Sequence, residues 1–446
     1  MTYGGPDTIA AISTAMAPSG IGIVRISGPR AIEIADRIFS PGGGEPLSAA
    51  KSHTIQYGHI TERGAVLDEV LVSVLRAPRT YTREDTVEIN CHGGNLVTRQ
   101  VLEAAIHAGA RMAEPGEFTK KAFLNGRIDL SQAEAVMDLI SSENRAAVKS
   151  ALSHLGGAVR RKISSIREEV LHETAFIEAA LDDPEHFDLE GYPARLRETT
   201  EELCGEVRAL INTADEGRIL KNGVATVILG RPNVGKSTLL NMLAGADRAI
   251  VTPIAGTTRD VLEEQLTLAG VPLRVMDTAG LRDSSDEIEK IGVARARAAA
   301  EAADLILYVI DGTSEISDED VEYARAFAGR TAVVIINKAD MELRVSEEDA
   351  GSVLPGAKVV RMSALEGTGA GELGEVIRSA FLRGEVRDSN EVYITNLRHK
   401  DALSRTEESL RRVTESIDAG MPEDLFTVDL MDACAALGEI TGEEAS

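Results

Sequence analysis

The sequence predicts a multidomain protein in which an α+β domain precedes an all-α helical domain, with an α/β domain inserted into the helical one. Three observations predict this arrangement. At roughly 100–200 residues per domain, the 446 residues are enough for several domains. Residues 116–183 contain no proline and have a helical pattern, which returns after residue 397. Residues 218–383 instead alternate short apolar runs with helical segments, as α/β domains do.

Composition and charge exclude several classes of protein. With 43% apolar residues the chain is ordinary for a globular protein, so wholesale disorder is excluded. Its 72 acidic residues exceed its 47 basic ones and give a formal charge of -25. This excess argues against a protein that coats nucleic acid or an anionic membrane through a basic surface, although it leaves room for a local basic patch.

The cysteines and the apolar runs indicate the compartment. Cys91, Cys204 and Cys434 are far apart and odd in number, so they predict neither a disulfide framework nor a paired zinc site. We expect Cys434 to be a buried, small apolar residue. Apolar runs such as residues 305–310 are too short to span a bilayer, and no targeting segment is evident. The expectation is a soluble, cytoplasmic protein with no membrane partner.

The first stretch, to about residue 118, mixes short β-rich runs with turns. Residues 21–26 form a β-branched run that is closed by Ser27-Gly28-Pro29, and residues 70–75 and 86–89 are further strand candidates. Helical patterning lies between and after these runs, for instance at residues 96–108. This mixture predicts a small α+β domain.

The helical region begins with a predicted capping box, in which Ser131 is followed by Glu134 at the required spacing. Apolar residues from Ala133 to Ile140 then recur with the period of a helix. Further helices are predicted at about residues 193–214 and from about residue 397 onward. We expect Gly420-Met421-Pro422 to divide this last region into two helices.

In the middle segment, several runs of mostly apolar residues are candidates for buried strands, and helix-like segments separate most of them. The candidates are residues 224–229, 273–276, 305–310, 332–336 and 358–361. This pattern predicts a doubly wound, largely parallel sheet. In such a sheet the ligand binds beyond the carboxyl ends of the strands.

A phosphate-binding loop is predicted after the first of these strands. The residues from Gly230 to Ser237 match the pattern G-x-x-x-x-G-K-S between a predicted strand and a predicted helix. The glycines let backbone N–H groups approach phosphate oxygens, and the start of the helix adds positive potential. Lys236 can reach the β- and γ-phosphates, and the Ser237 hydroxyl can bind magnesium.

Three further runs identify the nucleotide as GTP. Asp277-Thr278-Ala279-Gly280 follows a strand, where an Asp-x-x-Gly run can contact the magnesium shell and the γ-phosphate. Asn337-Lys338-Ala339-Asp340 ends another strand, and its aspartate can accept two hydrogen bonds that guanine donates and adenine does not. Ser363-Ala364-Leu365 follows the last strand, as a backbone contact to guanine should. In this order and spacing, the runs predict a GTPase.

The residue after the Asp-x-x-Gly run is Leu281, whereas Ras-like switches carry a glutamine there that orients the attacking water. A leucine side chain can neither donate nor accept a proton, so hydrolysis must use another group. The nearby candidates, among which composition alone does not choose, are Arg282, Asp283, Asp286, Glu287 and Glu289.

Sequence runs along almost the whole chain resemble one family. They are DTIAA (7–11), GIVRISG (22–28), PGEF (115–118), AFLNG (122–126), QAEA (132–135), IAGTTRD (254–260) and EKIG (289–292). In these runs the chain resembles the TrmE-Era-like GTPase family, and within it the bacterial tRNA modification GTPases of the MnmE (TrmE) type. Because the matches lie in the GTPase segment and in its flanks, they exclude a generic ribosome-assembly GTPase.

The resemblance implies a domain plan and an activity. It implies a folate-binding, dimerising α+β domain (1–118), a discontinuous helical domain (119–217 and 384–446) and an inserted P-loop G domain (218–383). Such proteins are potassium-stimulated GTPases that act as homodimers with an FAD-dependent partner, MnmG, in a heterotetramer or larger complex. Together they add an aminomethyl or carboxymethylaminomethyl group to the fifth carbon of the wobble uridine of certain tRNAs. The one-carbon donor is 5,10-methylene- or 5-formyl-tetrahydrofolate.

The resemblance also implies roles for residues of the G domain. Glu289 matches the glutamate that orients the hydrolytic water, and Arg282 matches an arginine in the moving switch region. Ser237 and Thr258 match the Mg²⁺ ligands. The positions that match the K⁺ site and its loop are Asn233, Thr252, Ile254 and Thr257. The GTP-binding positions as a whole are Asn233, Val234, Gly235, Lys236, Ser237, Thr238, Thr252, Pro253, Ile254, Ala255, Gly256, Thr257, Thr258, Asp277, Thr278, Ala279, Gly280, Asn337, Lys338, Ala339, Asp340, Ser363, Ala364 and Leu365.

Two departures from the family pattern concern the folate site and the tail. Arg25, Glu88 and Arg127 match the folate-binding positions, but the family usually has lysine where this chain has Arg127, and a salt-bridged structural arginine is the alternative. Family members typically end in a Cys-x-Gly-Lys tail beyond an Ile-Thr-Gly-Glu run, whereas this sequence stops at Ser446, soon after that run. The alternative function is therefore a tail-less, GTP-driven switch or assembly module that hydrolyses GTP without modifying tRNA.

Overall fold

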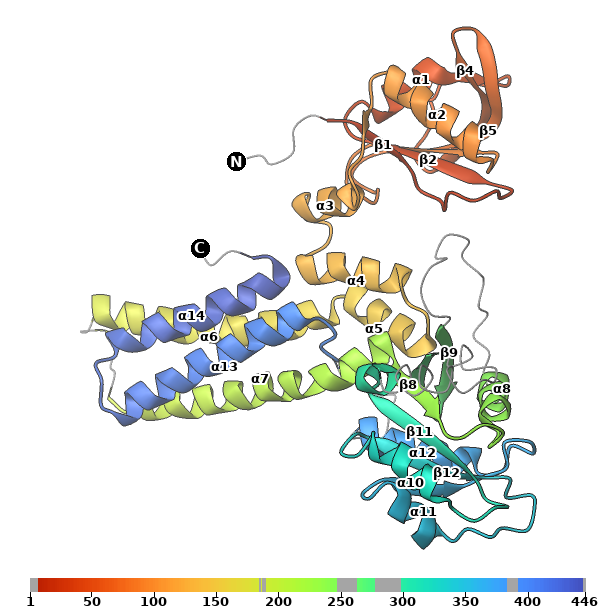
Figure 1. The fold of residues 1–446 in the computed structure, drawn as a ribbon. Coiled ribbons are helices and arrows are strands. Elements are labelled where there is room, and N and C mark those ends of the chain that lie inside the picture. Colours follow the sequence, from red (N-terminus) through yellow and green to blue (C-terminus); the bar gives the residue numbers. More distant parts are fainter. Residues whose placement is uncertain are drawn as a thin grey trace. The chain divides into compact units, whose positions relative to one another are not determined.

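The computed structural model describes residues 7–183, 186, 190–246, 263–276, 298–382 and 392–443. The chain divides into two compact units, Met1–Val136 and Met137–Ser446. The first unit is an α+β domain, as predicted, and the second contains a helical bundle and a largely parallel sheet (Figure 1).

The first unit consists of a seven-stranded sheet with two helices, α1 and α2, packed against one face. Its elements are β1 (Ile9–Ile12), β2 (Gly22–Ser27), α1 (Ala31–Ile38), β3 (Phe39–Pro41), β4 (Thr54–Glu62), β5 (Ala65–Leu75), β6 (Thr86–Cys91), α2 (Asn95–His107), β7 (Arg111–Met112), α3 (Glu117–Leu124) and most of α4 (Leu130–Ile140). The strand order is β3-β4-β5-β6-β2-β1-β7, and neighbours are antiparallel except β1 and β7. The predicted strands and helix of this region are confirmed as β2, β5, β6 and α2.

Alternation along the strands separates the two faces of this sheet. Val72 and Val74 of β5 are fully buried and pack in the same core as α1 and α2. The opposite face carries polar residues, because strand register places Glu88 of β6 between Ser73 of β5 and Arg25 of β2. Arg25 and Glu88, two of the predicted folate-binding residues, therefore lie side by side on the face that α1 and α2 do not cover.

The start of α4 differs from the prediction. The capping box expected at Ser131 and Glu134 is wrong, because the helix begins at Leu130. The Asp129 carboxylate accepts a hydrogen bond from the backbone N–H of Gln132 at 2.9 Å, and the Gln132 side-chain oxygen accepts one from the N–H of Asp129 at 3.0 Å. Ser131 is instead buried and donates to the Asp129 carboxylate at 2.6 Å. An aspartate two positions earlier thus takes the capping role that we assigned to the serine.

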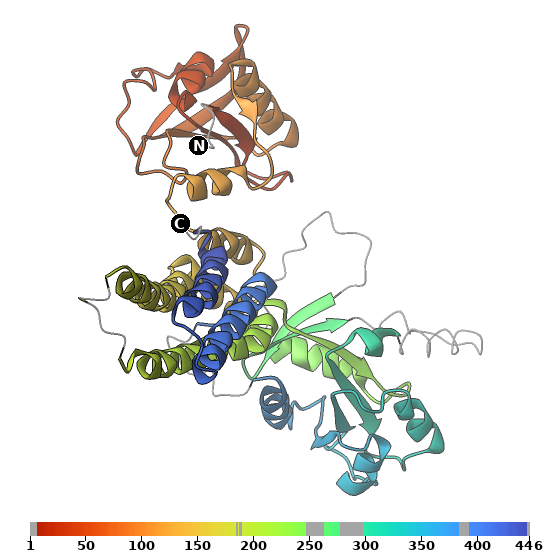
Figure 2. The same cartoon turned by 90° about the vertical axis from the view of Figure 1, so that its left-hand side faces the viewer.

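The helical part of the second unit is built from segments that are far apart in the chain. Its further helices are α5 (Arg145–Leu155), α6 (Ala158–Asp182), α7 (Tyr192–Asn222), α13 (Leu397–Asp418) and α14 (Asp424–Thr441). α6, α7, α13 and α14 run side by side in both views (Figures 1 and 2) and share one apolar core. The predicted break at residues 420–422 is confirmed between α13 and α14.

The remaining part of the second unit is the predicted doubly wound sheet. Its elements are β8 (Val224–Leu229), α8 (Lys236–Ala246), β9 (Glu263–Leu268), β10 (Val271–Met276), β11 (Leu305–Asp311), α10 (Asp318–Arg325), β12 (Ala332–Asn337), α11 (Glu347–Val353), β13 (Lys358–Arg361) and α12 (Ala370–Phe381). The order is β13-β12-β11-β8-β10-β9, and only β9 runs antiparallel to its neighbour. Separate apolar clusters cover the sheet's two faces. The predicted strands are confirmed, whereas β9 was not predicted.

Two expectations from the cysteines and the apolar runs can be compared with the structure. Cys91, Cys204 and Cys434 are all free thiols, and Cys434 is fully buried in the core of the bundle, as expected. Among the helices that the structure describes, none is both long and apolar enough to cross a membrane.

His154 of α5 is a buried titratable group whose ionisation opposes folding. It is 4% exposed, and its Nε2 atom lies 2.8 Å from the carbonyl oxygen of Tyr393, so Nε2 carries a proton and donates it. Burial lowers the pKa of the His154 imidazole below its usual 6.5, and the hydrogen bond to Tyr393 opposes this only in part. Below about pH 6.5 the unfolded chain therefore binds a proton at this residue more readily than the folded chain does.

We predict that His154→Gln reduces the loss of stability on acidification. Glutamine keeps a donor for the Tyr393 carbonyl but has no charge to gain, so the stability of the parent relative to the variant should fall as the pH is lowered from about 8 to about 5.5. One proton contributes at most about 1.4 kcal/mol per pH unit. Urea unfolding followed by circular dichroism at several pH values measures this difference. A difference that stays constant with pH would contradict the prediction.

Candidate functional site

The predicted phosphate loop lies between β8 and α8, at the carboxyl end of a central strand of the sheet. Gly230 and Gly235 have φ angles of 141° and 100°, which residues with a side chain rarely adopt. A Cβ atom at Gly230 would lie 2.2 Å from the Val309 carbonyl oxygen, and one at Gly235 would lie 2.2 Å from Nδ2 of Asn337. Both glycines are therefore required by backbone shape and by close packing, which leaves a backbone cradle of the kind that phosphate groups fit.

Lys236 and Ser237 open α8 directly after this loop. The Lys236 ammonium donates to the carbonyl oxygens of Gly230 at 2.7 Å and Arg231 at 2.6 Å, and so folds back over the loop. Burial lowers the pKa of Lys236, an effect that nearby phosphate charge would oppose. Ser237 and Thr238 are exposed in the first turn of the helix, whereas Val234 is buried in the core below the loop.

Asn337 connects the phosphate loop to the predicted guanine-binding loops. Its side chain is 3% exposed at the end of β12, where Nδ2 donates to the Val234 carbonyl at 2.8 Å. Its Oδ1 accepts a hydrogen bond from the backbone N–H of Ala364 at 3.0 Å. The structure thus brings together three of the predicted runs, which begin at residues 230, 337 and 363.

The other residues of the guanine-binding runs lie around this contact. Lys338 has a left-handed backbone (φ 66°), and its ammonium lies 2.5 Å from the Asp311 carboxylate. Burial of Asp311 opposes ionisation, but hydrogen bonds from Lys338 and Thr313 outweigh it and lower the pKa of that carboxyl. The side chain of Asp340 is exposed, and the N–H of Ala339 donates to the Met362 carbonyl at 3.1 Å. Ser363 and Ala364 are buried, whereas Leu365 is exposed.

Part of the predicted site lies outside the described residues. This part comprises Thr252, Pro253, Ile254, Ala255, Gly256, Thr257, Thr258, Asp277, Thr278, Ala279, Gly280, Arg282 and Glu289. Of the positions assigned to metal ions and to hydrolysis, the structure therefore describes Asn233 and Ser237.

In the first unit, two of the three predicted folate positions contact one aromatic ring, and the third forms an ion pair with one of these two. The Arg25 guanidinium forms an ion pair with Glu88 at 2.8 Å. Its central carbon lies 5.9 Å from the ring centre of Tyr81 and 5.4 Å from that of Phe118. The guanidinium of Arg127 lies 5.6 Å from the same Tyr81 ring. Both arginines therefore make cation–π contacts with Tyr81, a residue that the sequence analysis did not single out.

Arg127 is not held by an ion pair with any described carboxylate. Its side chain is exposed and donates to the backbone carbonyl of Thr80. The described contacts thus differ from the salt-bridged arginine that was the alternative for this position.

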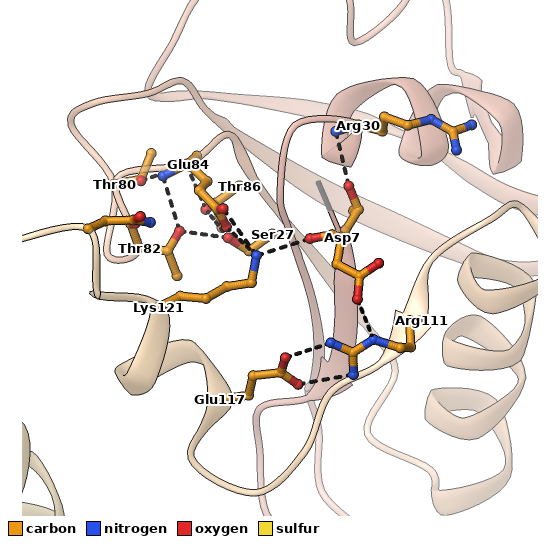
Figure 3. Close-up of polar contacts among 12 residues, drawn as sticks. Asp7, Ser27, Arg30, Thr80, Thr82, Glu84, Thr86, Arg111, Glu117 and Lys121 are labelled. Atoms are coloured by element: carbon orange, nitrogen blue, oxygen red, sulfur yellow. Dashed lines mark hydrogen bonds and ion pairs between the residues drawn. The ribbon is translucent and has the colours of Figure 1, made fainter. Parts of the chain in front are cut away.

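The loop that carries Tyr81 is fastened at several points, which can be followed in Figure 3. The Lys121 ammonium contacts the Glu84 carboxylate at 2.9 Å and the Asp7 carbonyl at 3.0 Å. At the other side, the hydroxyl of buried Thr82 lies 2.6 Å from that of Ser27 on β2. These contacts hold the residues that follow Tyr81 in place, so the position of Tyr81 is set by the fold.

A polar pocket of about 490 Å³ lies elsewhere in the second unit. Its lining includes Asp138, Glu143, Lys221, Gln265 and Arg274, and Lys221 and Asp138 form an ion pair at 2.7 Å. None of the described residues that we predicted to bind GTP lines it. This pocket is therefore separate from the predicted nucleotide site.

Comparison with known proteins agrees with these features. The family model "MnmE helical domain" matches residues 130–446, and the model "GTP-binding protein TrmE N-terminus" matches residues 8–127. The tRNA modification GTPase MnmE of Lachnoclostridium phytofermentans is 49% identical over 438 residues, which are 98% of this chain and 95% of that protein. The tRNA modification GTPase MnmE of Bacillus subtilis is 46% identical over 440 residues, 98% of this chain and 96% of that protein.

A solved structure also resembles part of the chain. It is a variant of Era from Aquifex aeolicus bound to GDP and aluminium fluoride, with 28% identity and a TM-score of 0.28, and it covers 41% of this chain and 65% of that one. The family models and the near full-length relatives decide the assignment. The chain belongs to the MnmE family of tRNA modification GTPases, which are GTP hydrolases.

Proposed function

We propose that this GTPase works with an FAD-dependent, MnmG-type partner on the wobble uridine of certain tRNAs. The product is an aminomethyl or carboxymethylaminomethyl group on the fifth carbon, and 5,10-methylene- or 5-formyl-tetrahydrofolate is the one-carbon donor. The observation that carries this proposal is that Arg25, paired with Glu88, and Arg127 both contact the Tyr81 ring in a chain that also has a formed phosphate loop. A GTPase without a folate-dependent reaction would need only the phosphate loop.

The residues at the phosphate loop fit a nucleotide. The cradle at Gly230 and Gly235 would let backbone N–H groups approach phosphate, and Lys236 stands at its rim with a half-buried side chain. Asp340, the last residue of the predicted guanine-binding run that begins at Asn337, is exposed and can accept hydrogen bonds from a guanine. These residues would bind and orient GTP, and we assign the positioning of the hydrolytic water to Glu289, with Arg282 nearby in sequence.

We propose a magnesium ion on Ser237 and Thr258 and a potassium ion on Asn233, with Thr252, Ile254 and Thr257 completing its loop. Asn233 has a left-handed backbone (φ 63°) in the phosphate loop, and its exposed amide makes no hydrogen bond to another described residue. An amide oxygen is a suitable ligand for a hard cation. A monovalent cation there would place positive charge beside the phosphates, where other GTPases use an arginine.

The residues around Tyr81 fit a folate. Folate combines a flat pterin ring with an anionic glutamate tail, so a site for it needs hydrogen-bonding groups, an aromatic neighbour and positive charge. Glu88 can accept hydrogen bonds from ring N–H groups, and Arg25 and Arg127 can donate to the carboxylates of the tail. Strand register places Glu88 beside Arg25, and the Tyr81 ring lies against Arg127, so the fold brings these groups together.

We also propose that the first unit mediates a homodimer. On the open face of its sheet, Ile55 and Tyr57 of β4 and Leu71 of β5 are 63%, 51% and 48% exposed. Strand register places Leu71 opposite Tyr57, and Ile55 in the same row as Glu88 and Arg25. A self-complementary apolar patch of this kind suits a twofold interface, which would lie next to the proposed folate residues.

The remaining proposals concern the domain plan and the tRNA. We propose the domain ranges 1–118, 119–217 with 384–446, and 218–383, and a cytoplasmic location for the complex. Since the chain has a formal charge of -25, we assign most of the tRNA-binding surface to the flavoprotein partner.

We predict that Asn233→Ala removes the stimulation of GTP hydrolysis by potassium. Loss of charge stabilisation in the transition state typically lowers kcat by roughly a hundredfold, so the rate in potassium should fall toward the rate in sodium. Steady-state hydrolysis in the two salts measures the effect, with Asn222→Ala, an exposed asparagine outside the loop, as control. Equal rates in both salts for the unmodified protein would refute the potassium proposal.

We predict that the unmodified chain restores the modified wobble nucleoside in a bacterial strain that lacks its own MnmE, and that Arg25→Ala does not. The variant should still hydrolyse GTP, because Arg25 belongs to the first unit and the phosphate loop to the second. Arg99→Ala, an exposed arginine on α2 at the opposite face of the sheet, is the matched control. Nucleoside analysis of bulk tRNA reports the outcome. If the unmodified chain restores nothing while hydrolysing GTP, the switch or assembly module becomes the better assignment.

We predict that Leu71→Glu makes the protein monomeric. A charge at the centre of the apolar patch would be buried without a partner in the dimer but hydrated in the monomer. Leu96→Glu on α2 is the control, because Leu96 is 69% exposed on a helix that packs against the other face. Light scattering coupled to size-exclusion chromatography gives the mass of each. A Leu71→Glu variant that remains dimeric places the interface elsewhere.

A further inference from the structure

The side chain of Arg231, the second residue of the phosphate loop, extends from the loop to the start of α10. Its guanidinium donates to the Ser317 hydroxyl at 2.6 Å and to the Asp320 carboxylate at 3.0 Å. The two ends of this contact are 89 residues apart in the chain. The ion pair therefore fastens the loop to the helix that follows β11, the strand that pairs directly with β8.

Asp320 is a rigid anchor for this arginine. Its side chain is 10% exposed, and the same oxygen accepts hydrogen bonds from the N–H of Ser317 at 3.0 Å and from its hydroxyl at 2.8 Å. The bond from the Ser317 N–H, together with the one that the N–H of Asp320 donates to the Ser317 hydroxyl at 3.3 Å, forms the capping box of α10. The backbone carbonyl of Asp320 in turn accepts a hydrogen bond from the buried Tyr308 of β11 at 3.0 Å. The acceptor for Arg231 is thus fixed to the central sheet.

The phosphate loop is consequently held from two sides. Asn337 holds its carboxyl-terminal part through the Val234 carbonyl, and Asp320 holds its amino-terminal part through Arg231. The Arg231 carbonyl is also one of the two that accept hydrogen bonds from Lys236. A shift of Arg231 would therefore move the loop backbone. It would also move the carbonyl oxygen that accepts a hydrogen bond from Lys236, the lysine predicted to contact the phosphates.

We propose that Arg231 is a positioning residue for the nucleotide, which acts by pairing with Asp320 and holding the phosphate loop in its binding shape. A preformed loop loses less conformational entropy when phosphate binds, so the pair increases the affinity for GDP and GTP alike. Interactions made equally in the ground and transition states change KM more than kcat. The proposal goes beyond GTP hydrolysis itself, and it depends on neither the folate nor the potassium assignment.

The test compares nucleotide affinity in variants of the full chain. Arg231→Ala and Asp320→Asn should each raise the Kd for a fluorescent GDP analogue by about tenfold, the equivalent of about 1.4 kcal/mol. The Kd of the double variant should be at most about twofold higher than that of either single variant, because both substitutions remove the same contact. KM for GTP should rise in parallel, and kcat should fall by less than kcat/KM does.

The matched control is Asp349→Asn. Asp349 forms the same capping box with Ser346 at the start of α11, and no described contact joins it to the phosphate loop. Both variants keep the N-cap serine and replace the aspartate of the capping box, which costs the helix about 1 kcal/mol at most, so thermal stability should fall similarly in both variants, whereas nucleotide affinity should fall only in Asp320→Asn. Equal affinity losses in Asp349→Asn would mean that the effect is general destabilisation, and the proposal would be wrong.

Two further outcomes would overturn the proposal. If Arg231→Ala weakens binding while Asp320→Asn does not, Arg231 contacts the nucleotide directly. If neither variant changes the Kd, the pair has no part in binding. Should Arg231→Ala fold poorly, Arg231→Gln and Arg231→Lys replace it. Loss of affinity with glutamine and its partial recovery with lysine support an ionic contact, and full affinity with glutamine refutes it.

Discussion

The nucleotide site depends on one buried side-chain amide, that of Asn337. Its nitrogen and oxygen are used at the same time, one by the phosphate loop and the other by the loop that follows β13. A buried amide that loses either partner leaves a polar atom without a hydrogen bond, which is costly away from water. The distance between the predicted phosphate loop and the loop expected to contact guanine is therefore set by a side chain at the end of β12. The parallel order of β8, β11, β12 and β13 brings these loops to one edge of the sheet.

In the first unit, the two faces of the mostly antiparallel sheet have different roles. One face packs its valines and isoleucines against α1 and α2, so the opposite face is free to carry Arg25, Glu88 and an exposed apolar patch. The loop of Tyr81 and the helix α3 lie close to the polar part of this face, and Lys121 links them through Glu84. The apolar part stays uncovered. A ligand site and an association surface can thus share one face without competing for the same residues.

Much of this fold could be predicted from local patterns, and the exceptions have physical causes. Four of the five predicted strands of the α/β part are mostly buried, and all five contain an apolar run, which is why they were predicted within a few residues. β9 was missed because it is an edge strand that starts with Glu263, Glu264 and Gln265, a polar run that does not alternate like a half-buried strand. At the start of α4, Ser131 and Asp129 both had acceptable spacing, and hydrogen-bond geometry alone decides between them.

The sites could be predicted only where a residue's role follows from its neighbours in the chain. The phosphate loop is such a case, because its glycines and lysine act together within eight residues. Tyr81 and the pair of Arg231 with Asp320 are not, since their partners come from other strands and helices. The signal that could have indicated Tyr81 is an aromatic residue in a turn-rich loop just before a strand that carries Glu88. Sequence patterns alone do not supply its contacts with Arg25 and Arg127.

The ion pairs of this acidic chain differ in how firmly they hold an arginine. Its 72 acidic residues outnumber its 47 basic ones. An exposed pair such as Arg30 and Glu33 stabilises little, whereas the pair of Arg231 and Asp320 includes a carboxylate that is 10% exposed. Such anchoring fixes a guanidinium in place but also cancels most of its charge. A polyanion as large as tRNA gains little from an arginine whose charge is cancelled in this way, which agrees with the proposal that a more basic surface, on the proposed flavoprotein partner, is its main binding site.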